Sequence, residues 1–192
     1  MPDKTATTPR PPAPSKVKIL ATADRLFYDE GVHTVGVDRI IAQSHVTKAT
    51  FYKHYRSKDV LIAAYVATRA DRARNDVDSD RETLKDASAV LRSMIERFAV
   101  ESRRNGYRGC PFINAATSQL DAAGPVTPAV VAWRSWLRST LVELLTEAGS
   151  PAPEAAADDL LLARDGAFGG TPISDSQATE SSLHRALDRL IP

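Results

Sequence analysis

The side chains best suited to chemistry in this 192-residue sequence lie in one basic segment near its amino-terminal end. Residues 36–58 read GVDRIIAQSHVTKATFYKHYRSK, and between Arg39 and Lys58 there are five Lys or Arg residues and no Asp or Glu. The segment has the spacing of two short helices joined by a turn at 44–46, the layout of a helix-turn-helix. An α-helix fits the major groove of B-DNA, and the first turn of a recognition helix reaches the edges of the bases. The pattern therefore predicts binding to double-stranded DNA.

Within this unit, apolar and polar positions are expected to separate. Four apolar residues are expected to form the small core between the two helices: Ile40, Ile41, Val46 and Phe51. Thr47 is placed to cap the second helix, and the small Ala49 and Thr50 let that helix approach the groove closely and offer methyl groups to thymine. Tyr, His and Lys side chains commonly hydrogen-bond phosphates. The candidate DNA-binding residues are Gly36, Arg39, Thr47, Lys48, Ala49, Thr50, Tyr52, Lys53, His54 and Lys58.

Helix-turn-helix spacing is weakly specific by itself, so a solvated basic helix face is the alternative to a DNA-binding one. The net charge is +1, yet residues 1–60 hold ten Lys/Arg against six Asp/Glu, while residues 61–192 hold fifteen against eighteen. A basic amino-terminal segment followed by an acidic remainder favours a polyanion-binding region joined to a region with another role. With so few charges, chance unevenness is also an explanation.

The remainder of the chain predicts helices. A content of 43% hydrophobic and 26% charged residues is that of an average soluble protein and excludes a collagen-like or wholly disordered chain. Residues 1–14 are rich in proline and predict a disordered tail, and the polar stretch 71–81 predicts a helix end followed by a loop. Elsewhere apolar residues recur at spacings of three and four, and no segment alternates convincingly with a period of two. We therefore expect an all-α fold of about nine helices.

The sequence also argues against a membrane protein or a secreted protein. The longest apolar run, 60–67, has eight residues, which is far too short for a membrane span. The first 16 residues lack the apolar core of a secretory leader. A single cysteine, Cys110, cannot form an intramolecular disulfide, which fits a reducing compartment. We expect a cytoplasmic protein with no membrane partner.

Enzyme classes find little support. The sequence holds no GxSxG nucleophile elbow, no GxGxxG or P-loop phosphate cradle and no HExxH metal site. Its four histidines lack cysteine or carboxylate partners at metal-ligand spacing. We expect no enzyme activity, no cofactor and no metal, and a catalytic Cys110 with a distant histidine is the remaining alternative.

Position by position, residues 19–61 resemble the amino-terminal part of the TetR family of bacterial transcriptional regulators. The matching residues are Ile19, Ala23, Leu26, Phe27, Gly31, Val37, Ile40, Val46, Thr47, Thr50, Phe51, Tyr52, His54, Tyr55, Ser57, Lys58 and Leu61. Two further stretches, RGCPFINAA at 108–116 and LLLARDGA at 160–167, resemble the ligand-binding half of one subgroup of that family. The chain departs from the pattern at His45, where the family usually has glycine, because such a turn often needs a positive φ. It departs again at 117–119, Thr-Ser-Gln, where the subgroup usually has an acidic residue.

The resemblance implies a division of labour between two domains. Residues 15–73 would form a TetR-type helix-turn-helix DNA-binding domain, and residues 74–192 a ligand-binding and dimerisation domain. The implied function is that of a repressor that binds a palindromic operator as a homodimer and leaves it when a small-molecule effector binds. Activation uses the same DNA-binding half and stays open. A second hypothesis is a small-molecule-binding or interaction module with a degenerate helix-turn-helix, for which His45 is the one argument.

Two sets of residues in the second half are candidates for these roles. An effector pocket is expected to be partly apolar, and its candidates are Met94, Phe98, Tyr107, Cys110, Phe112, Asn114, Trp133 and Trp136. The family dimerises through its last two helices, where the candidates are Leu161, Arg164, Phe168, Leu183, Leu187 and Leu190. For both sets, packing inside a single chain is the alternative. Cys110 lies near Arg108 at an expected helix start, which favours a reactive thiol, whereas its apolar neighbours favour an inert buried one.

Overall fold

The computed structural model describes residues 12–104, 106–117, 123–170 and 175–191. Within these ranges the regular structure is entirely helical, so the all-α prediction is confirmed. The helices found there are α1 (Pro14–Glu30), α2 (Val37–Ser44), α3 (Lys48–His54), α4 (Lys58–Leu84), α5 (Ala87–Ser102), α6 (Pro111–Thr117), α7 (Val126–Glu147), α8 (Pro153–Gly170) and α9 (Ser176–Asp188). None of them is long and apolar enough to cross a membrane.

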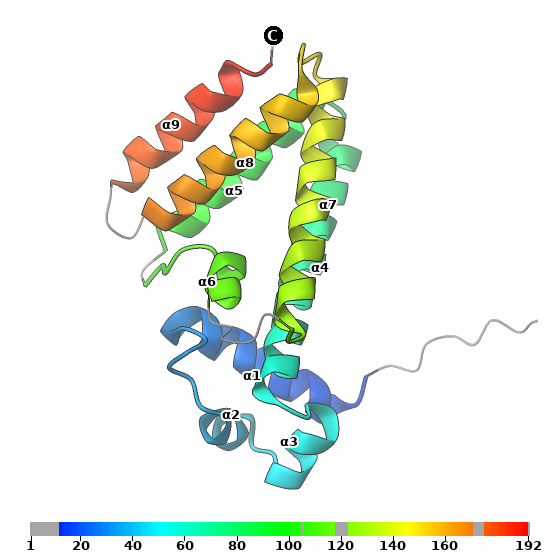
Figure 1. The fold of residues 1–192 in the computed structure, drawn as a ribbon, viewed down its shortest axis with the longest axis vertical. Helices are drawn as coiled ribbons and strands as arrows, with labels where there is room; N and C mark the ends of the chain where they lie inside the picture. Colours follow the sequence, from blue (N-terminus) through cyan, green and yellow to red (C-terminus); the bar gives the residue numbers. More distant parts are fainter. Residues whose placement is uncertain (1–11, 105, 118–122, 171–174, 192) are drawn as a thin grey trace, which may run out of the picture.

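The helices form two groups that are joined by α4. Figure 1 shows α1, α2 and α3 gathered at one end of the molecule, while α5, α7, α8 and α9 pack beside one another at the other end. The first half of α4 packs on α1, and its second half packs on α5 and α7. The short α6 lies between the groups, against α4 and α7. One helix therefore belongs to both groups.

Local hydrogen bonds set the starts of α3 and α4 and the turn before α3. Thr47 accepts a hydrogen bond from the backbone N–H of Thr50, so its predicted N-cap role is confirmed. Ser57, which has a residue type and position suited to capping the next helix, accepts one from the N–H of Val60. His45 ends α2 with φ 53° and ψ 44°, in the left-handed region, and its N–H still bonds the Ala42 carbonyl oxygen at 3.2 Å. The turn is therefore made with a histidine where glycine is the easier residue.

The expected loop at 71–81 is wrong, because α4 continues without a break to Leu84. Long-range ion pairs hold this polar part of the helix in place. Arg81 lies 3.0 Å from Glu147 and 3.4 Å from Glu143 on α7, and Asp80 pairs with Arg97 on α5. Local hydrophobic periodicity gives no sign of such ion pairs, because Glu143 and Glu147 are more than 60 residues from Arg81 in the sequence.

The ends of the chain also differ in detail from the expectation. Residues 1–11 of the expected tail lie outside the described residues, and α1 already begins at Pro14. The spacing of Ser174 and Gln177 predicts a capping box for the last helix, but Ser174 also lies outside the described residues, and the cap is Asp175, whose carboxylate accepts the Gln177 N–H at 2.8 Å. In α7 the spacing of Trp133, Leu137, Leu141 and Leu144 predicts an apolar face, and all four residues are buried.

The connection between α5 and α6 passes very close to α8. Gly109 in this connection has φ +90°, and a Cβ atom there would lie 3.0 Å from the carbonyl oxygen of Phe168. Gly106 in the same connection has φ +79°, but nothing lies within 4 Å of its Cβ position. Only glycine meets both requirements at Gly109, because a side chain there is strained by its backbone angle and also obstructed by α8.

This pair of glycines gives a test of the close approach. We expect Gly106→Ala to lower the free energy of unfolding by about 1 kcal/mol, since only its φ is unfavourable. Gly109→Ala should lower it by a further 1–3 kcal/mol or so, because the added methyl group must push α8 away. Urea denaturation of the two variants measures the difference, and equal losses would contradict the close packing.

Candidate nucleic-acid interface and ligand cavity

The helix α3 exposes the face that the sequence assigned to DNA. Phe51 is fully buried and fixes α3 against the core of the first three helices. On the other side Lys48, Ala49 and Lys53 are exposed. Tyr52 is also exposed, with its ring edge-on to Phe51 at a centroid distance of 5.2 Å. The hydroxyls of Thr47 and Thr50 lie 2.9 Å apart at the start of the helix. This face therefore combines the small Ala49 and Thr50 with the basic Lys48 and Lys53.

The basic side chains around α3 differ in how free they are. Arg39 forms a two-point ion pair with Glu30, with Nη2 at 2.7 Å from Oε1, so its charge is already neutralised. Lys48 lies 3.5 Å from Asp38, and both side chains are well exposed, which makes this a weak pair. Among the described residues no ion pair involves Lys53 or Arg56, and both are exposed. Arg56, in the turn between α3 and α4, was not among the sequence candidates.

The end of α3 is tied to the first turn of α1. His54 Nε2 lies 2.7 Å from Ser15 Oγ, and the buried Tyr55 donates its hydroxyl to the Lys16 carbonyl oxygen at 3.4 Å. Lys58 begins α4 and is half-buried, and this burial lowers its pKa. His54 and Lys58 are therefore partly engaged in local structure. Gly36 is exposed at the N-cap of α2, beside the same surface.

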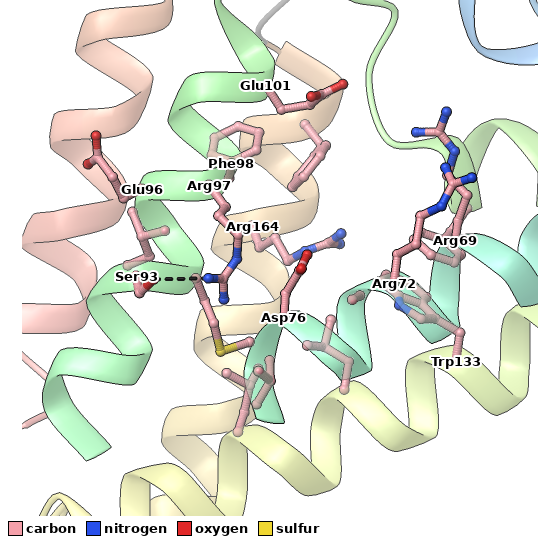
Figure 2. A pocket seen from close by; sticks show the side chains of 18 of the residues that line it. Arg69, Arg72, Asp76, Ser93, Glu96, Arg97, Phe98, Glu101, Trp133 and Arg164 are labelled. Carbon is pink, nitrogen blue, oxygen red and sulfur yellow. Dashed lines mark hydrogen bonds between the residues drawn. The ribbon is translucent and has the colours of Figure 1, made fainter. Parts of the chain in front are cut away.

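A cavity of about 620 Å³ lies among α4, α5, α7, α8 and α9, and Tyr28 from α1 also reaches it. In the view of Figure 2, Arg69, Arg72 and Trp133 lie on one side of it, Ser93, Glu96 and Arg97 on the other, and Arg164 and Asp76 between them. Its apolar wall includes five of the eight pocket candidates: Met94, Phe98, Phe112, Trp133 and Trp136. A volume of this size is that of a small-molecule site.

Three pocket candidates lie outside the cavity wall. Asn114 donates its side-chain amide to the Arg108 carbonyl oxygen at 2.9 Å and so secures the turn before α6. Cys110 is 2% exposed, and Nη2 of Arg164 is 3.6 Å from its sulfur. The hydroxyl of Tyr107 is buried with no hydrogen-bond partner among the described residues, and burial raises the pKa of this tyrosine.

Charged residues form a larger part of the cavity wall than the sequence suggested. Arg69 and Arg72 on α4, and Arg164 on α8, all line it. Charged side chains on helices usually point to solvent, so spacing alone did not mark them. Arg69 and Arg72 both bind the carboxylate of Asp24 on α1, at 2.8 Å and 3.0 Å.

A hydrogen bond in the cavity wall joins α1 to α5. The hydroxyl of Tyr28 donates to Glu101, and both residues line the cavity. Burial, followed by this hydrogen bond, raises the pKa of Tyr28 well above its usual value. The guanidinium groups of Arg69 and Arg104 both lie over the Tyr28 ring, 4.2 Å and 4.4 Å from its centre. The cavity therefore contacts the first group of helices directly.

The dimer candidates lie mostly inside the single chain. Leu161, Leu183 and Leu187 are buried, and Leu190 is half-buried. Phe168 and Arg164 line the cavity together with Leu183. These positions favour the single-chain alternative for most of the set. Leu162 on α8, which was not among the dimer candidates, is 73% exposed.

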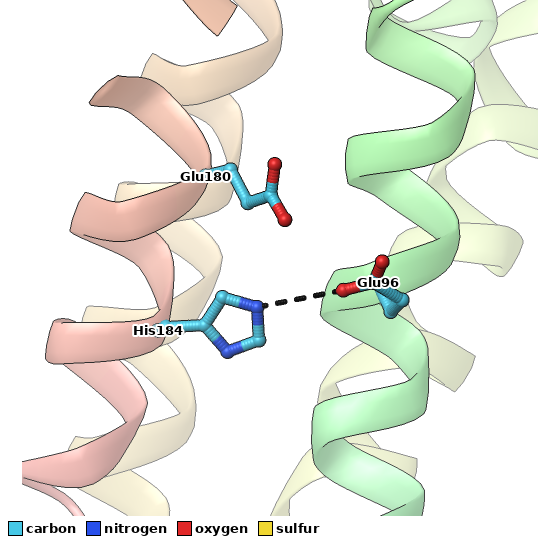
Figure 3. Close-up of side chains that lie close together, drawn as sticks. All are labelled: Glu96, Glu180 and His184. Atoms are coloured by element: carbon cyan, nitrogen blue, oxygen red, sulfur yellow. Dashed lines mark ion pairs between the residues drawn. The ribbon is translucent and has the colours of Figure 1, made fainter. Parts of the chain in front are cut away.

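One group of side chains has the donor types of a cation site. Glu180 and His184 on α9 face Glu96 on α5, with His184 Nε2 3.8 Å from a Glu96 oxygen (Figure 3). The sequence analysis missed this arrangement, although Glu180 and His184 are four residues apart on one helix. Arg103 already pairs with Glu180, and Glu96 is exposed. The charge of Glu180 is therefore already balanced by the guanidinium of Arg103.

Comparison with known proteins places these features in one family. Residues 19–65 match the model of the bacterial regulatory proteins of the tetR family. A TetR-family transcriptional regulator from Streptomyces coelicolor is 35% identical and superposes with a TM-score of 0.84, over 92% of this chain and 93% of that one. A TetR-family regulator from Agrobacterium tumefaciens, at 18% identity, has the same fold with a TM-score of 0.80, over 93% of this chain and 98% of its own.

A curated relative is similar over a shorter region. The transcriptional activator FasR of Mycolicibacterium smegmatis is 31% identical over 93 residues, which are 47% of this chain and 42% of that protein's length. The match to the Streptomyces structure, by contrast, runs through both groups of helices and the cavity between α4 and α9. With the helix-turn-helix and the helical body both accounted for, the chain belongs to the TetR family of transcriptional regulators.

Proposed function

We propose that this regulator is a repressor that binds a palindromic operator as a homodimer and releases it when a small molecule enters the cavity. The observation that carries the proposal is the sharing of α4, which packs on α1 and also lines the 620 Å³ cavity. We assign DNA binding to residues 15–73 and ligand binding and dimerisation to residues 74–192. Acting on DNA would place the protein in the cytoplasm.

The exposed face of α3 supports the DNA-binding part of the proposal. Lys53 and Arg56 carry charges with no ion-pair partner among the described residues, and phosphates are suitable partners for them. In the first turn, the small side chains of Ala49 and Thr50 let the helix lie deep in a major groove. The formed turn at His45 removes the main reason to regard the helix-turn-helix as degenerate.

The cavity wall supports the ligand-response part. Arg69 and Arg72 line the cavity and bind Asp24 on α1, and Tyr28 of α1 binds Glu101 on α5. A ligand that shifts α4 or draws these side chains away changes how α1 to α3 are held. The ligand can move this equilibrium only by as much as its affinities for the two arrangements differ.

Activation is the second candidate mode, since the Mycolicibacterium relative is named an activator. Both modes need the same DNA-binding helices, and they differ in the effect on transcription. In vitro transcription from the promoter upstream of the protein's own gene separates them. Added protein should lower the yield of transcript, whereas a rise would replace repression with activation.

The first experiment is fluorescence anisotropy with that upstream DNA and with unrelated DNA at two salt concentrations. Specific binding at least about 10³-fold tighter than to unrelated DNA, with two protomers per site, is the expected result. Equal and strongly salt-dependent binding to both DNAs would mean contacts to phosphates only. A folded protein that binds neither DNA would favour the interaction-module hypothesis.

Removing one free charge of α3 tests the docking. We expect Lys53→Gln to weaken binding about 5–10-fold and to reduce the slope of log affinity against log salt by about 1, because one phosphate contact is lost. The matched control is Lys85→Gln, which removes an exposed lysine between α4 and α5, far from α3 (Figure 1). If both variants bind as the unchanged protein does, α3 does not contact DNA in this way.

Leu162 offers a test of the dimer. An operator with two half-sites needs two recognition helices about 34–36 Å apart, and hence a second chain. A leucine that is 73% exposed in one chain is a suitable anchor for a partner surface. We expect Leu162→Asp to produce monomers in sedimentation experiments without loss of helix content. Val131→Asp, at a 57% exposed residue of α7, is the control and should leave the dimer intact. A Leu162→Asp protein that remains dimeric would exclude this face.

A further inference from the structure

The part of the cavity between α7 and α8 is built around one partly buried guanidinium. The side chain of Arg164 is 19% exposed. Its guanidinium lies 4.8 Å from the ring centre of Trp133 and 4.2 Å from that of Phe168. In Figure 2 it extends from α8 toward the middle of the cavity wall. A ligand in the cavity therefore meets this cation.

The carboxylate that balances Arg164 is shared with a second arginine. Asp165 lies 2.9 Å from Arg164 and also pairs with Arg134 on α7. Asp24 is shared in the same way by Arg69 and Arg72, which line the cavity as well. Each group has two positive charges on one negative charge. A partly buried cation that shares its counterion is stabilised by a further anion.

A second donor in the same wall lacks an acceptor. Trp133 is 3% exposed, and its Nε1–H has no hydrogen-bond partner among the described residues. Its ring is stacked on Phe112, with centroids 3.7 Å apart and planes within 3° of parallel, so the indole is held rigidly. A buried donor without an acceptor is costly, and an oxygen atom supplied by a ligand would satisfy it.

Three carboxylates also line the cavity, and two of them lie against other groups. Glu101 accepts the hydroxyl of Tyr28. Glu96 is exposed and lies beside His184. Asp76 is exposed and takes part in no salt bridge of the described residues, and in the view of Figure 2 it lies beside Arg164. Arg164 and Trp133 nevertheless offer donors whose acceptor is shared or absent.

We propose that the effector is an organic anion, with an apolar or aromatic body in the cavity and a carboxylate or similar oxyanion held by Arg164. The indole N–H of Trp133 is the second donor to the same group. The apolar wall that would receive the body includes Met94, Phe98, Leu137, Leu141 and Leu160. This inference rests on the proposed ligand response and adds the chemical class of the ligand.

Two fluorescent dyes with the same ring system test the charge preference. Anilinonaphthalene sulfonate is an anion, and phenylnaphthylamine has the same aromatic body without the sulfonate. We expect the sulfonate dye to bind about 10-fold or more tighter, because only this dye can accept charge-assisted hydrogen bonds from Arg164. Quenching of the intrinsic fluorescence of Trp133 and Trp136 shows that a dye occupies this cavity, since both tryptophans line it.

Variants then assign the preference to Arg164. Arg164→Met should weaken binding of the sulfonate dye about 10-fold or more and leave the neutral dye within about 3-fold. The fold should tolerate this change, because Asp165 keeps its partner Arg134. Arg92→Met, at an exposed arginine that pairs with Asp188, is the control for surface binding and should leave both dyes unchanged. Trp133→Phe removes the indole N–H together with part of the ring, and it should weaken binding of the sulfonate dye more than binding of the neutral dye.

The outcomes separate this inference from the proposed function. Equal affinities for the two dyes, or a sulfonate affinity unchanged by Arg164→Met, would overturn the anion preference. If neither dye quenches the tryptophans, the cavity does not take aromatic ligands and this inference fails. If the sulfonate dye binds through Arg164 but leaves operator binding unchanged, the charge preference stands for this cavity, and the proposed release from DNA is the part that fails.

Discussion

The arrangement of the molecule depends on the double ion pair of Asp24. This carboxylate on α1 is 15% exposed and lies 2.8 Å from Arg69 and 3.0 Å from Arg72, two residues of α4. Charge-assisted hydrogen bonds of this kind are stronger than neutral ones and fix direction as well as distance. They hold the helices of the helix-turn-helix at a set angle to a helix that also packs on α5 and α7. The orientation of α3 relative to the body follows from this contact.

The same contact links the cavity to the proposed DNA surface. Arg69 also stacks on Tyr28, whose hydroxyl binds Glu101 on α5. The side chains that hold α1 in place are thus part of the cavity wall. A packed wall of this kind changes between discrete arrangements rather than deforming gradually. In the proposed response, occupation of the cavity would act on the orientation of α1 without any need for a long chain of intermediate contacts.

Features that depend on local chemistry were predictable from the sequence. Caps at Thr47 and Ser57 and the apolar stripe of α7 follow from hydrogen-bonding groups and spacing along one helix. Features that depend on distant partners were not. In the helix at 71–81, Arg81 pairs with Glu143 and Glu147 of α7, and the cavity role of Arg164 depends on helices that approach only in the folded chain. An arginine in a helix has the same sequence pattern whether it faces solvent or a cavity, so Arg69 and Arg72 were missed and Arg164 was expected at the dimer interface instead.

The cysteine illustrates why packing decides chemistry. Arg108 and Cys110 are near each other in sequence, which favoured an activated thiol. In the structure, Arg108 is turned toward α1 and donates to the Asp29 carbonyl oxygen at 2.8 Å. The guanidinium near the sulfur is instead that of Arg164, from 54 residues further along the chain. Since Arg164 is shared among Asp165, the faces of two aromatic rings and the sulfur, it is oriented by several contacts at once. A cation held in this way is prearranged for an anionic group, and little ordering cost remains when a ligand binds.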